Sequence, residues 1–351
     1  MTASTPVPEG PASTSKRQQR FNEGTGRLAA ILLSPTLLVL AVVVLFPIIS
    51  ALKESLFQSG QRLDENGFIV KGSTFVGLDN YLDIFRGETG DRFWNAFYNT
   101  TFFTVVCVVL ETVLGVAMAL IMHKAFKGRG LVRASILVPW AIPTVISALL
   151  WKWIFQADGI ANTLLGSQVL WSTEGWQSKL SVVIADTWKT APFIGLLVLA
   201  GLQTIPAEVY EAAKVDGANA WRTFTRITLP LVKPALLVAV LFRILDTLRI
   251  FDLPFVLVGQ HKNSVETLSM LAYDEASNVR FGPAAAYATL LFLYVAVVAY
   301  LFVKILGADV IGEARAKKPG GGRRKKNGGA GAAAATAAVG VSAASGSGRS
   351  I

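Results

Sequence analysis

The sequence predicts an all-α integral membrane fold with six transmembrane helices. Apolar residues make up 52% of the 351 residues and charged residues only 16%, and the mean hydropathy is +0.50. A soluble domain needs more charge than this to cover its surface. The apolar residues also gather into six long segments, and a helix needs about 20 such residues to cross a bilayer. Together these observations exclude an ordinary soluble domain.

The expected spans, in chain order, are residues 28–52, 96–122, 134–150, 180–202, 235–258 and 283–306. The first has no charged residue and is longer than the apolar part of a signal peptide, so we expect it to be retained. The six spans form one expected domain, residues 27–311. Residues 1–26 and the basic, Gly/Ala-rich residues 312–351 are too poor in large apolar side chains to fold, and we expect both to be disordered tails.

Lys and Arg are concentrated in four places: before the first span, after the second, between the fourth and fifth, and after the sixth. With six spans, all four places lie on one face of the membrane. The positive-inside rule makes that face cytoplasmic, so both termini are expected in the cytoplasm. The net charge of +10 is therefore interpreted as a topology signal, and no nucleic-acid partner is expected.

Several chemical classes lack support in the sequence. Cys107 is the single cysteine, and the two histidines, His123 and His261, are far apart, so neither a disulfide nor a metal site is expected. The chain contains no P-loop motif and no recognisable nucleophile–base pair. We therefore expect no catalytic residue and no cofactor, and an intramembrane enzyme is the weakest hypothesis.

A polar segment, residues 211–234, separates the fourth and fifth spans. Glu211, Ala212 and Ala213 favour a helix with a small surface that another protein could approach closely. Gly217 is expected to end this helix, and Asn219 to cap a second short one. We expect the proline-containing residues 229–234 to break the second helix before the fifth span begins. The prediction is a helix–turn–helix on the cytoplasmic face, and an ordinary interfacial amphipathic loop is the alternative.

The spacing in this segment resembles the EAA loop of ABC importer permeases. Glu211-Ala212-Ala213 is followed after three residues by Gly217, after nine more by Ile227, and after one more by Leu229-Pro230. In that family the loop is the coupling helix, which docks into a groove of the ATPase subunit. The resemblance assigns this role to Glu211, Ala212, Ala213, Asp216, Gly217, Ile227, Leu229 and Pro230.

The resemblance extends from about residue 27 to residue 306. It is strongest to the carbohydrate-uptake branch of the family and, within that branch, to the first permease subunit of maltose/trehalose-type transporters. Further matching pieces are residues 76–81 and 185–192, together with Phe242-Arg243 and Phe251-Asp252, and the chain departs from the pattern after Leu257. The resemblance implies a type I ABC importer permease fold in a bacterial plasma (inner) membrane. It implies import of a carbohydrate, such as the disaccharides trehalose or maltose. The implied partners are a second homologous permease, a cytoplasmic ATPase dimer, an extracytoplasmic sugar-binding protein and the lipid bilayer.

Charged residues inside the expected spans mark the candidate substrate site, because each costs about 2.5–3.5 kcal/mol at a helix centre. Arg243, Asp246, Arg249 and Asp252 recur every three residues in the fifth span. Two interpretations stay open: a self-neutralising ladder, or a sugar site in which charged groups bind hydroxyls. Asp186 and Lys189 could pair with each other. Pro143 and Pro192 could kink their helices or merely be tolerated, since proline is common in membrane helices. The candidate substrate-binding residues are Glu111, Trp188, Lys189, Asp246, Arg249, Phe251 and Asp252.

A stand-alone ion-coupled secondary carrier is the alternative function. Glu111, Asp186 and Lys189 would then form a relay for protons or ions. This alternative leaves the polar segment at residues 211–234 unexplained, and the chain shows no internal repeat of the kind such carriers contain.

Overall fold

The computed structural model describes residues 28–63 and 69–316, and these residues are almost entirely helical. The first apolar helix begins at Leu28 and continues through η1 (Ala41–Leu45) and α2 (Phe46–Glu54). The elements that follow, in chain order, are β1 (Phe57–Leu63), β2 (Ile69–Phe75), α3 (Asp79–Ile84), α4 (Gly87–His123), α5 (Arg129–Ala141), α6 (Thr144–Ile154), α7 (Ile160–Leu165), α8 (Trp176–Gln203), α9 (Ala207–Val215), α10 (Ala220–Thr223), η2 (Phe224–Thr228), α11 (Leu229–Thr247), α12 (Asp252–Leu257), α13 (Leu268–Ser277) and α14 (Phe281–Ala316).

Among the described residues, five helices are long and apolar enough to cross a membrane. They are Leu28–Glu54, Gly87–His123, Trp176–Gln203, Ala220–Thr247 and Phe281–Ile305. A sixth crossing is present if the bent pair α5 and α6 is counted as one span. Each of the six expected spans therefore has a counterpart. The tails 1–26 and 317–351 lie outside the described residues, and α14 continues to Ala316, past the expected domain boundary at 311.

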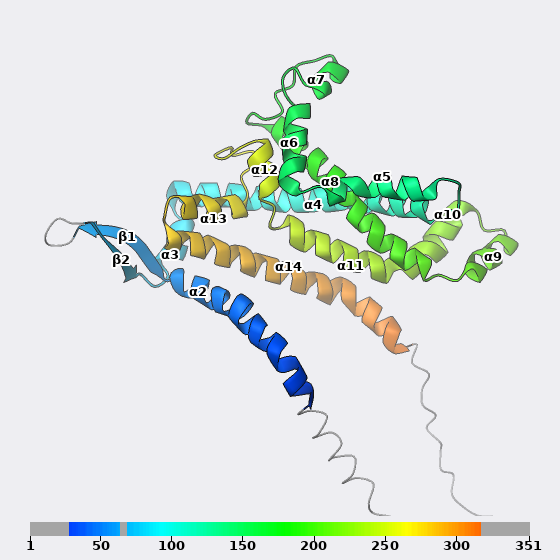
Figure 1. The fold of residues 1–351 in the computed structure, drawn as a ribbon, viewed down its shortest axis with the longest axis horizontal. Helices are drawn as coiled ribbons and strands as arrows, with labels where there is room; N and C mark the ends of the chain where they lie inside the picture. The colour runs from blue at the N-terminus through cyan, green and yellow to red at the C-terminus, as the bar shows by residue number, and fades with distance from the viewer. Residues whose placement is uncertain (1–27, 64–68, 317–351) are drawn as a thin grey trace, which may run out of the picture. The chain divides into compact units, whose positions relative to one another are not determined.

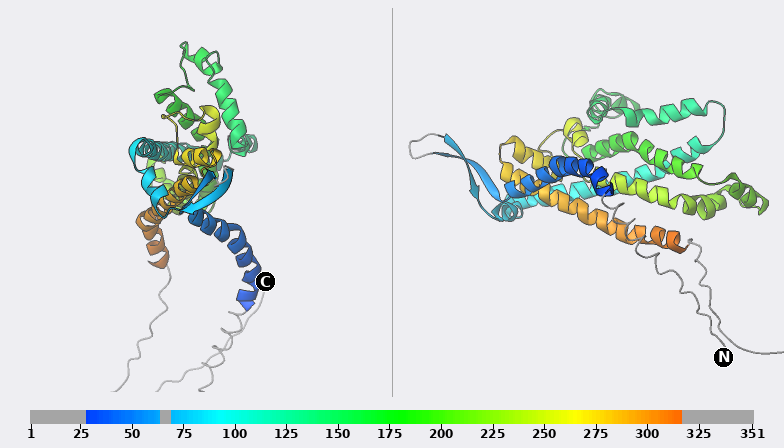
Figure 2. Two further views of the ribbon diagram at one scale, coloured as in Figure 1. Left: turned by 90° about the vertical axis from the view of Figure 1, so that its left-hand side faces the viewer. Right: turned by 60° about the horizontal axis from the view of Figure 1, so that its bottom comes forward.

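The third span is broken at Ile142 and Pro143, where α5 and α6 meet at 95°. Proline has no backbone N–H and forces the residue before it out of the helical region, and Ile142 accordingly has ψ 133°. The expected kink at Pro143 is therefore confirmed. In contrast, α8 runs unbroken through Pro192. Figures 1 and 2 show that α6 and α7 point away from the bundle formed by α4, α8 and α11.

Two expectations about the fifth span are wrong. The prolines at 230 and 234 do not break the chain, because α10, η2 and α11 form one continuous helix, Ala220–Thr247. The π-helical turn η2 accommodates Pro230: its wider turn lets the Leu229 N–H reach the Phe224 carbonyl. The helix also ends at Thr247 and not at Val258. Residues 248–251 are non-helical, and α12 begins at Asp252.

The bundle of α4, α8 and α11 is built on close backbone contacts (Figure 1). At Gly115 of α4, an added Cβ would lie 2.7 Å from the Ile194 Cβ and 2.9 Å from the Ala191 carbonyl oxygen of α8. At Gly201 of α8, an added Cβ would lie 2.7 Å from the Ala235 Cβ of α11. Small residues at such contacts let membrane helices approach closely, where dispersion and not the hydrophobic effect holds them together.

Outside the bundle, the segment between α12 and α13 is held to the first turns of α4. Asn99 Nδ2 donates to the carbonyls of Asn263 and Glu266 at 2.7 and 2.9 Å, and Arg92 pairs with Glu266 and Asp274.

The all-α expectation missed the antiparallel hairpin of β1 and β2, whose register runs from Phe57↔Phe75 to Leu63↔Ile69. Apart from this hairpin and the turns and loops between the elements, the described chain is helical, so the helical fold class is confirmed.

Candidate functional site

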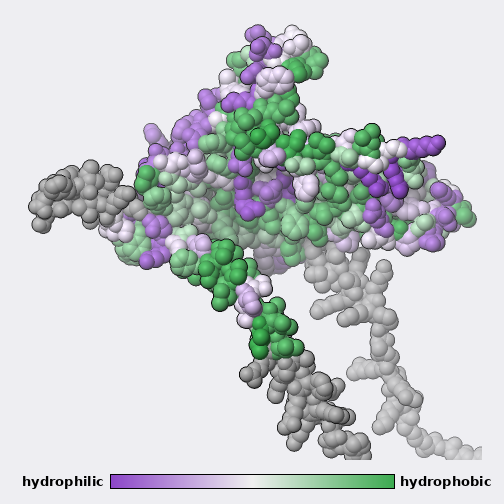
Figure 3. Space-filling model, viewed as in Figure 1, coloured by the Kyte–Doolittle hydropathy of each residue, from purple (hydrophilic) through white to green (hydrophobic). Residues whose placement is uncertain are grey.

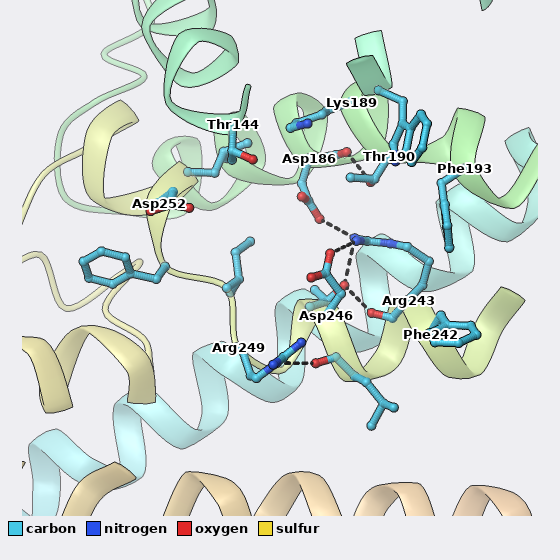
Figure 4. Close-up of a pocket in the computed structure, with 16 residues that line it drawn as sticks. Thr144, Asp186, Lys189, Thr190, Phe193, Phe242, Arg243, Asp246, Arg249 and Asp252 are labelled. Carbon is cyan, nitrogen blue, oxygen red and sulfur yellow. Dashed lines mark hydrogen bonds and ion pairs between the residues drawn. The ribbon is translucent and has the colours of Figure 1, made fainter. Parts of the chain in front are cut away.

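A cavity of about 500 Å³ lies between α5, α6, α8, α11 and α12. Its polar lining residues are Thr144, Asp186, Lys189, Thr190, Arg243, Asp246, Thr247, Arg249 and Asp252. Its aromatic lining residues are Trp140, Phe193, Phe242 and Phe251. Figure 3 shows hydrophilic residues gathered in the middle of an otherwise largely apolar face, and Figure 4 shows the labelled side chains around the hollow. The interruptions at residues 142–143 and 248–251 border this cavity, so broken helices build the site.

Arg243 of α11 is the centre of the charged cluster at one wall of the cavity (Figure 4). Its Nε donates to Glu111 Oε2 at 2.6 Å, and its Nη2 donates to Glu111 Oε1 at 3.0 Å. Glu111 is fully buried and reaches Arg243 from α4, and it also accepts a 2.6 Å hydrogen bond from Thr190. This two-point contact uses the planar fork of the guanidinium, which binds a carboxylate more specifically than an ammonium does.

The remaining Arg243 donors reach the cavity-lining groups. Nη1 donates to Asp246 Oδ2 at 2.5 Å, and Nη2 donates to Asp186 Oδ2 at 3.1 Å and to Thr247 Oγ1 at 2.8 Å. The Arg243 side chain is 4% exposed, whereas that of Asp246 is 66% exposed. One buried cation thus joins α4, α8 and α11, and Asp246 is the acidic partner that faces the open space. Such a cluster offsets its desolvation cost only because its hydrogen bonds are satisfied.

Lys189 binds a different partner from the one suggested by its spacing. Its ammonium donates to the Ile142 carbonyl at 2.9 Å, across the break between α5 and α6. Asp186, three residues earlier, pairs with Arg243, so the expected Asp186–Lys189 pair is wrong. The expected ladder within the fifth span forms only in part. Arg243 pairs with Asp246, but Arg249 donates to the Leu245 carbonyl at 3.0 Å.

The predicted substrate-binding residues divide into two groups. Lys189, Asp246, Arg249, Phe251 and Asp252 line the cavity. The other two do not. Glu111 lies behind Arg243, and the Trp188 ring packs edge-on against Trp151 with centroids 5.6 Å apart.

Sequence reasoning missed several cavity residues, namely Trp140, Thr144, Thr190, Phe193 and Phe242. The aromatic ones, Trp140, Phe193 and Phe242, follow the same spacing as lipid-facing or packing residues, so no local signal separated them. The break at Pro143 was the one available signal for Trp140 and Thr144, which flank it. The sequence did single out Arg243, as one of four charged residues that recur every three positions in the fifth span. It did not indicate that Arg243 is the centre of a cluster.

This arrangement suits a neutral molecule with many hydroxyl groups. Carboxylates, ammonium and guanidinium groups together offer acceptors and donors for hydroxyls, and aromatic faces pack on the apolar faces of sugar rings. The volume falls within the range of about 300–1,000 Å³ that is typical of small-molecule sites.

A second candidate site lies in the segment from α9 to η2. The α9 helix ends in a Schellman motif: Gly217 adopts φ +72°, its N–H donates to the Lys214 carbonyl, and the Ala218 N–H donates to the Ala213 carbonyl. Asn219 then caps α10, since its side chain accepts from the Arg222 N–H at 2.8 Å. The expected helix–turn–helix is therefore present, with both boundary residues in the expected roles.

The predicted coupling residues differ in exposure. Glu211, Ala212, Asp216, Gly217 and Pro230 are exposed, Ile227 and Leu229 are half-buried, and Ala213 is buried. Ala212 therefore offers the small outer surface, while Ala213 faces the protein interior. Next to them, Val215 and Trp221 have exposed fractions of 88% and 72%. Large apolar side chains at such exposure give the turn a surface that a partner protein could cover.

Comparison with known proteins identifies the family. Residues 111–312 match the family model described as binding-protein-dependent transport system inner membrane component. The chain belongs to this family. It is 37% identical to the trehalose/maltose transport system permease protein MalF of Thermococcus litoralis, over 83% of this chain and 96% of that protein. It is 40% identical to the trehalose transport system permease protein SugA of Mycobacterium tuberculosis, over 82% of this chain and 91% of that protein.

The fold agrees with the family. A crystal structure of a bacterial ABC transporter involved in the import of the acidic polysaccharide alginate matches with a TM-score of 0.67 and 23% identity, over 86% of this chain and 100% of that chain. A structure of the alginate transporter in complex with an alginate-bound periplasmic protein matches with a TM-score of 0.68 and 21% identity. The chain is thus a multi-pass permease of the binding-protein-dependent importers. This membership rules against the stand-alone ion-coupled carrier.

Proposed function

We propose that this permease imports a neutral disaccharide of the trehalose or maltose type through the cavity beside Arg243. The observation that carries the proposal is the identity of 37–40% to trehalose and maltose permeases, over more than 80% of this chain. The cavity supports it, because the lining that Lys189, Asp246, Arg249, Phe251 and Asp252 provide combines hydroxyl-binding groups with an aromatic face. A sugar would displace water from these groups and satisfy them in turn.

ATP hydrolysis is proposed to take place on a separate subunit that docks at α9 and the following turn. The exposed Glu211, Ala212 and Asp216 together with Val215 form a small surface on α9, and the turn at Gly217 joins this surface to the start of the helix Ala220–Thr247. Helix-in-groove docking fits such a surface. The other end of the same helix carries Arg243 and Asp246. Movement of the docked ATPase would therefore reach the cavity through a single rod.

A second permease subunit is proposed to complete the pathway. The first apolar helix, Leu28–Glu54, has none of its most apolar window buried, and Phe281–Ile305 has only 6% buried. Lipid can cover such faces, but Asp246, Arg249 and Asp252 are exposed polar groups at membrane depth. Polar groups at that depth need a protein partner or a water-filled space. A homologous permease placed against this face would close the cavity around the substrate.

The membrane orientation is proposed from the charge distribution. We propose that both termini and the α9–η2 segment are cytoplasmic, in line with the Lys and Arg counts of the four basic flanks. An extracytoplasmic sugar-binding protein would then deliver sugar on the other side, where β1 and β2 lie. Residues 27–311 are proposed to form one transmembrane domain.

Co-purification with an ATPase readout tests the proposal. The tagged chain is expressed with its neighbouring genes and purified in detergent, and the proteins that accompany it are identified. ATPase activity is then measured with trehalose, maltose and glucose, each with the binding protein. We expect a second permease and an ATPase to co-purify and one disaccharide to stimulate hydrolysis several-fold. Isolation of the chain without an ATPase, or stimulation by no sugar, would contradict the proposal.

A further inference from the structure

We infer that Arg243 and Glu111 form a positioning pair that aims the Asp246 carboxylate at one hydroxyl group of the sugar. The inference rests on the proposed function, since it presumes that a sugar enters this cavity. It gives Glu111, which lies outside the cavity lining, a role in substrate discrimination. It also assigns the discrimination to one acceptor atom, Asp246 Oδ1.

A chain of hydrogen bonds leads from the protein interior to the cavity. Glu111 is fully buried in α4 and holds Arg243 through Nε and Nη2 at 2.6 and 3.0 Å. Arg243 uses its remaining terminal nitrogen, Nη1, for Asp246 Oδ2 at 2.5 Å. Figure 4 shows Asp246 and Asp186 converging on this guanidinium at the edge of the hollow. Because a guanidinium is planar, fixing two of its nitrogens against Glu111 also fixes the direction of the third.

Asp246 needs such a support because of where it lies. It is the next-to-last residue of α11, its side chain is 66% exposed, and the chain leaves the helix after Thr247. An exposed carboxylate at a helix end is free to change rotamer, and a mobile acceptor discriminates poorly between hydroxyl positions. The bond to Arg243 occupies Oδ2, whereas Oδ1 has no hydrogen bond to any residue in the described part of the chain. This free oxygen is the acceptor offered to the substrate.

Thr190 and Asp186 complete the support from α8. Thr190 Oγ1 donates to Glu111 Oε1 at 2.6 Å, and Asp186 Oδ2 accepts from Arg243 Nη2 at 3.1 Å. Three helices therefore fix one guanidinium, and a change in any of them reaches Asp246 through it. A purely structural ion pair would stabilise the bundle in the same way. Only a positioning pair would change which hydroxyl the cavity selects.

The experiment measures selection among hydroxyl positions. The complete complex is reconstituted in proteoliposomes, and uptake of trehalose and of its monodeoxy analogues is measured as maximal rate and KM. The variants are D246N, E111Q and the double variant D246N/E111Q. The matched control is E266Q, because Glu266 is also buried and also held by one arginine at two points, Arg92 at 2.5 and 2.8 Å, but it lies outside the cavity lining.

We expect the unaltered complex to prefer trehalose over one particular deoxy analogue by about tenfold or more, the worth of one hydrogen bond to a charged group. D246N and E111Q should each lose most of that preference, at the same hydroxyl position. The double variant should be no worse than D246N alone, because the two groups act through one interaction. E266Q should keep the preference even if it lowers the amount of assembled complex.

Three results would overturn the inference. D246N could retain the full preference at every position, E111Q could retain it while D246N loses it, or the two losses could add in the double variant. If E111Q does not assemble, R243K replaces it: lysine keeps the charge but lacks the fork, so the same loss is expected, and an unchanged preference would contradict us. An unaltered complex that imports no sugar would instead refute the proposed function, which keeps the two failures distinguishable.

Discussion

The charged residues around the cavity illustrate how a membrane protein can bury charged side chains at the depth of the hydrocarbon core. Arg243 is 4% exposed and is surrounded by oxygen atoms of Glu111, Asp186, Asp246 and Thr247. An unpaired charge at this depth would be strongly unfavourable, so each group depends on the others. Removing one partner is therefore expected to cost more than the interaction itself contributes.

Lys189 allows a test of how the break between α5 and α6 is held. Replacing it with methionine keeps the length of the side chain but leaves the Ile142 carbonyl, now 2.9 Å from the ammonium, without its donor. We expect a loss of about 1–3 kcal/mol, seen as a lower melting temperature of the purified complex. Lys152→Met is the control, because Lys152 also donates to a backbone carbonyl, that of Val256, but at an exposed position. Equal melting temperatures for both variants would contradict this role.

At the scale of elements, one rod connects the two candidate sites. The helix Ala220–Thr247 begins beside the Schellman turn at Gly217 and ends at the charged cluster. At about 1.5 Å per residue, its 28 residues span about 42 Å. The π-helical turn η2 near its start is the one irregular part, and π-turns are frequent at functional positions. A displacement at α9 would therefore pass through the Schellman turn at Gly217 and then along one helix to Asp246.

Gly217 tests the turn on which that rod depends. Its φ of +72° is strained for a β-branched residue, by roughly 1–2 kcal/mol, so Gly217→Val should distort the turn and the position of α9. We expect the variant to insert into the membrane but to lose sugar transport and sugar-stimulated ATP hydrolysis. Gly217→Asn is the control, because asparagine tolerates the left-handed region. Normal transport by the valine variant would show that the turn has no part in coupling.

Gly115 tests the packing of α4 on α8. An added methyl group would meet Ile194 at 2.7 Å, so Gly115→Ala should destabilise the bundle by about 1–3 kcal/mol. Gly130→Ala in α5 is the control, since an added Cβ there meets nothing within 4 Å and alanine favours a helix. The melting temperature of the purified Gly115→Ala variant should fall, whereas that of Gly130→Ala should rise. A stable Gly115→Ala variant would contradict the close approach of these helices.

The elements show what could be predicted from the sequence and why the rest could not. Long apolar runs and the chemistry of Gly217, Asn219 and Pro143 are local signals, and the structure follows them. The continuity of the helix through Pro230 is not local: it depends on a π-turn that supplies a different carbonyl. The cavity likewise needed tertiary information, because Phe193, Phe242 and Trp140 become a lining only when three helices meet.

At the scale of the whole molecule, membrane orientation can be tested with single cysteines. Cys107 is the one cysteine in the sequence and is buried, so an added cysteine provides the only accessible thiol. Val215 and Leu164 are suitable positions, with exposed fractions of 88% and 81%. In intact cells, a membrane-impermeant maleimide should label Leu164→Cys but not Val215→Cys. In inside-out vesicles from cells that express the chain without the partner ATPase, the pattern should reverse, and labelling of both from one side would contradict the proposed topology.

The central claim is that nucleotide hydrolysis on a partner drives sugar through the cavity of this chain. The most direct measurement is uptake of radiolabelled trehalose into proteoliposomes that contain the complete complex with its binding protein. We expect accumulation against a gradient that requires ATP, that is unaffected by collapse of ion gradients, and that Gly217→Val abolishes. Accumulation by this chain alone, driven by an ion gradient and without an ATPase, would contradict the account.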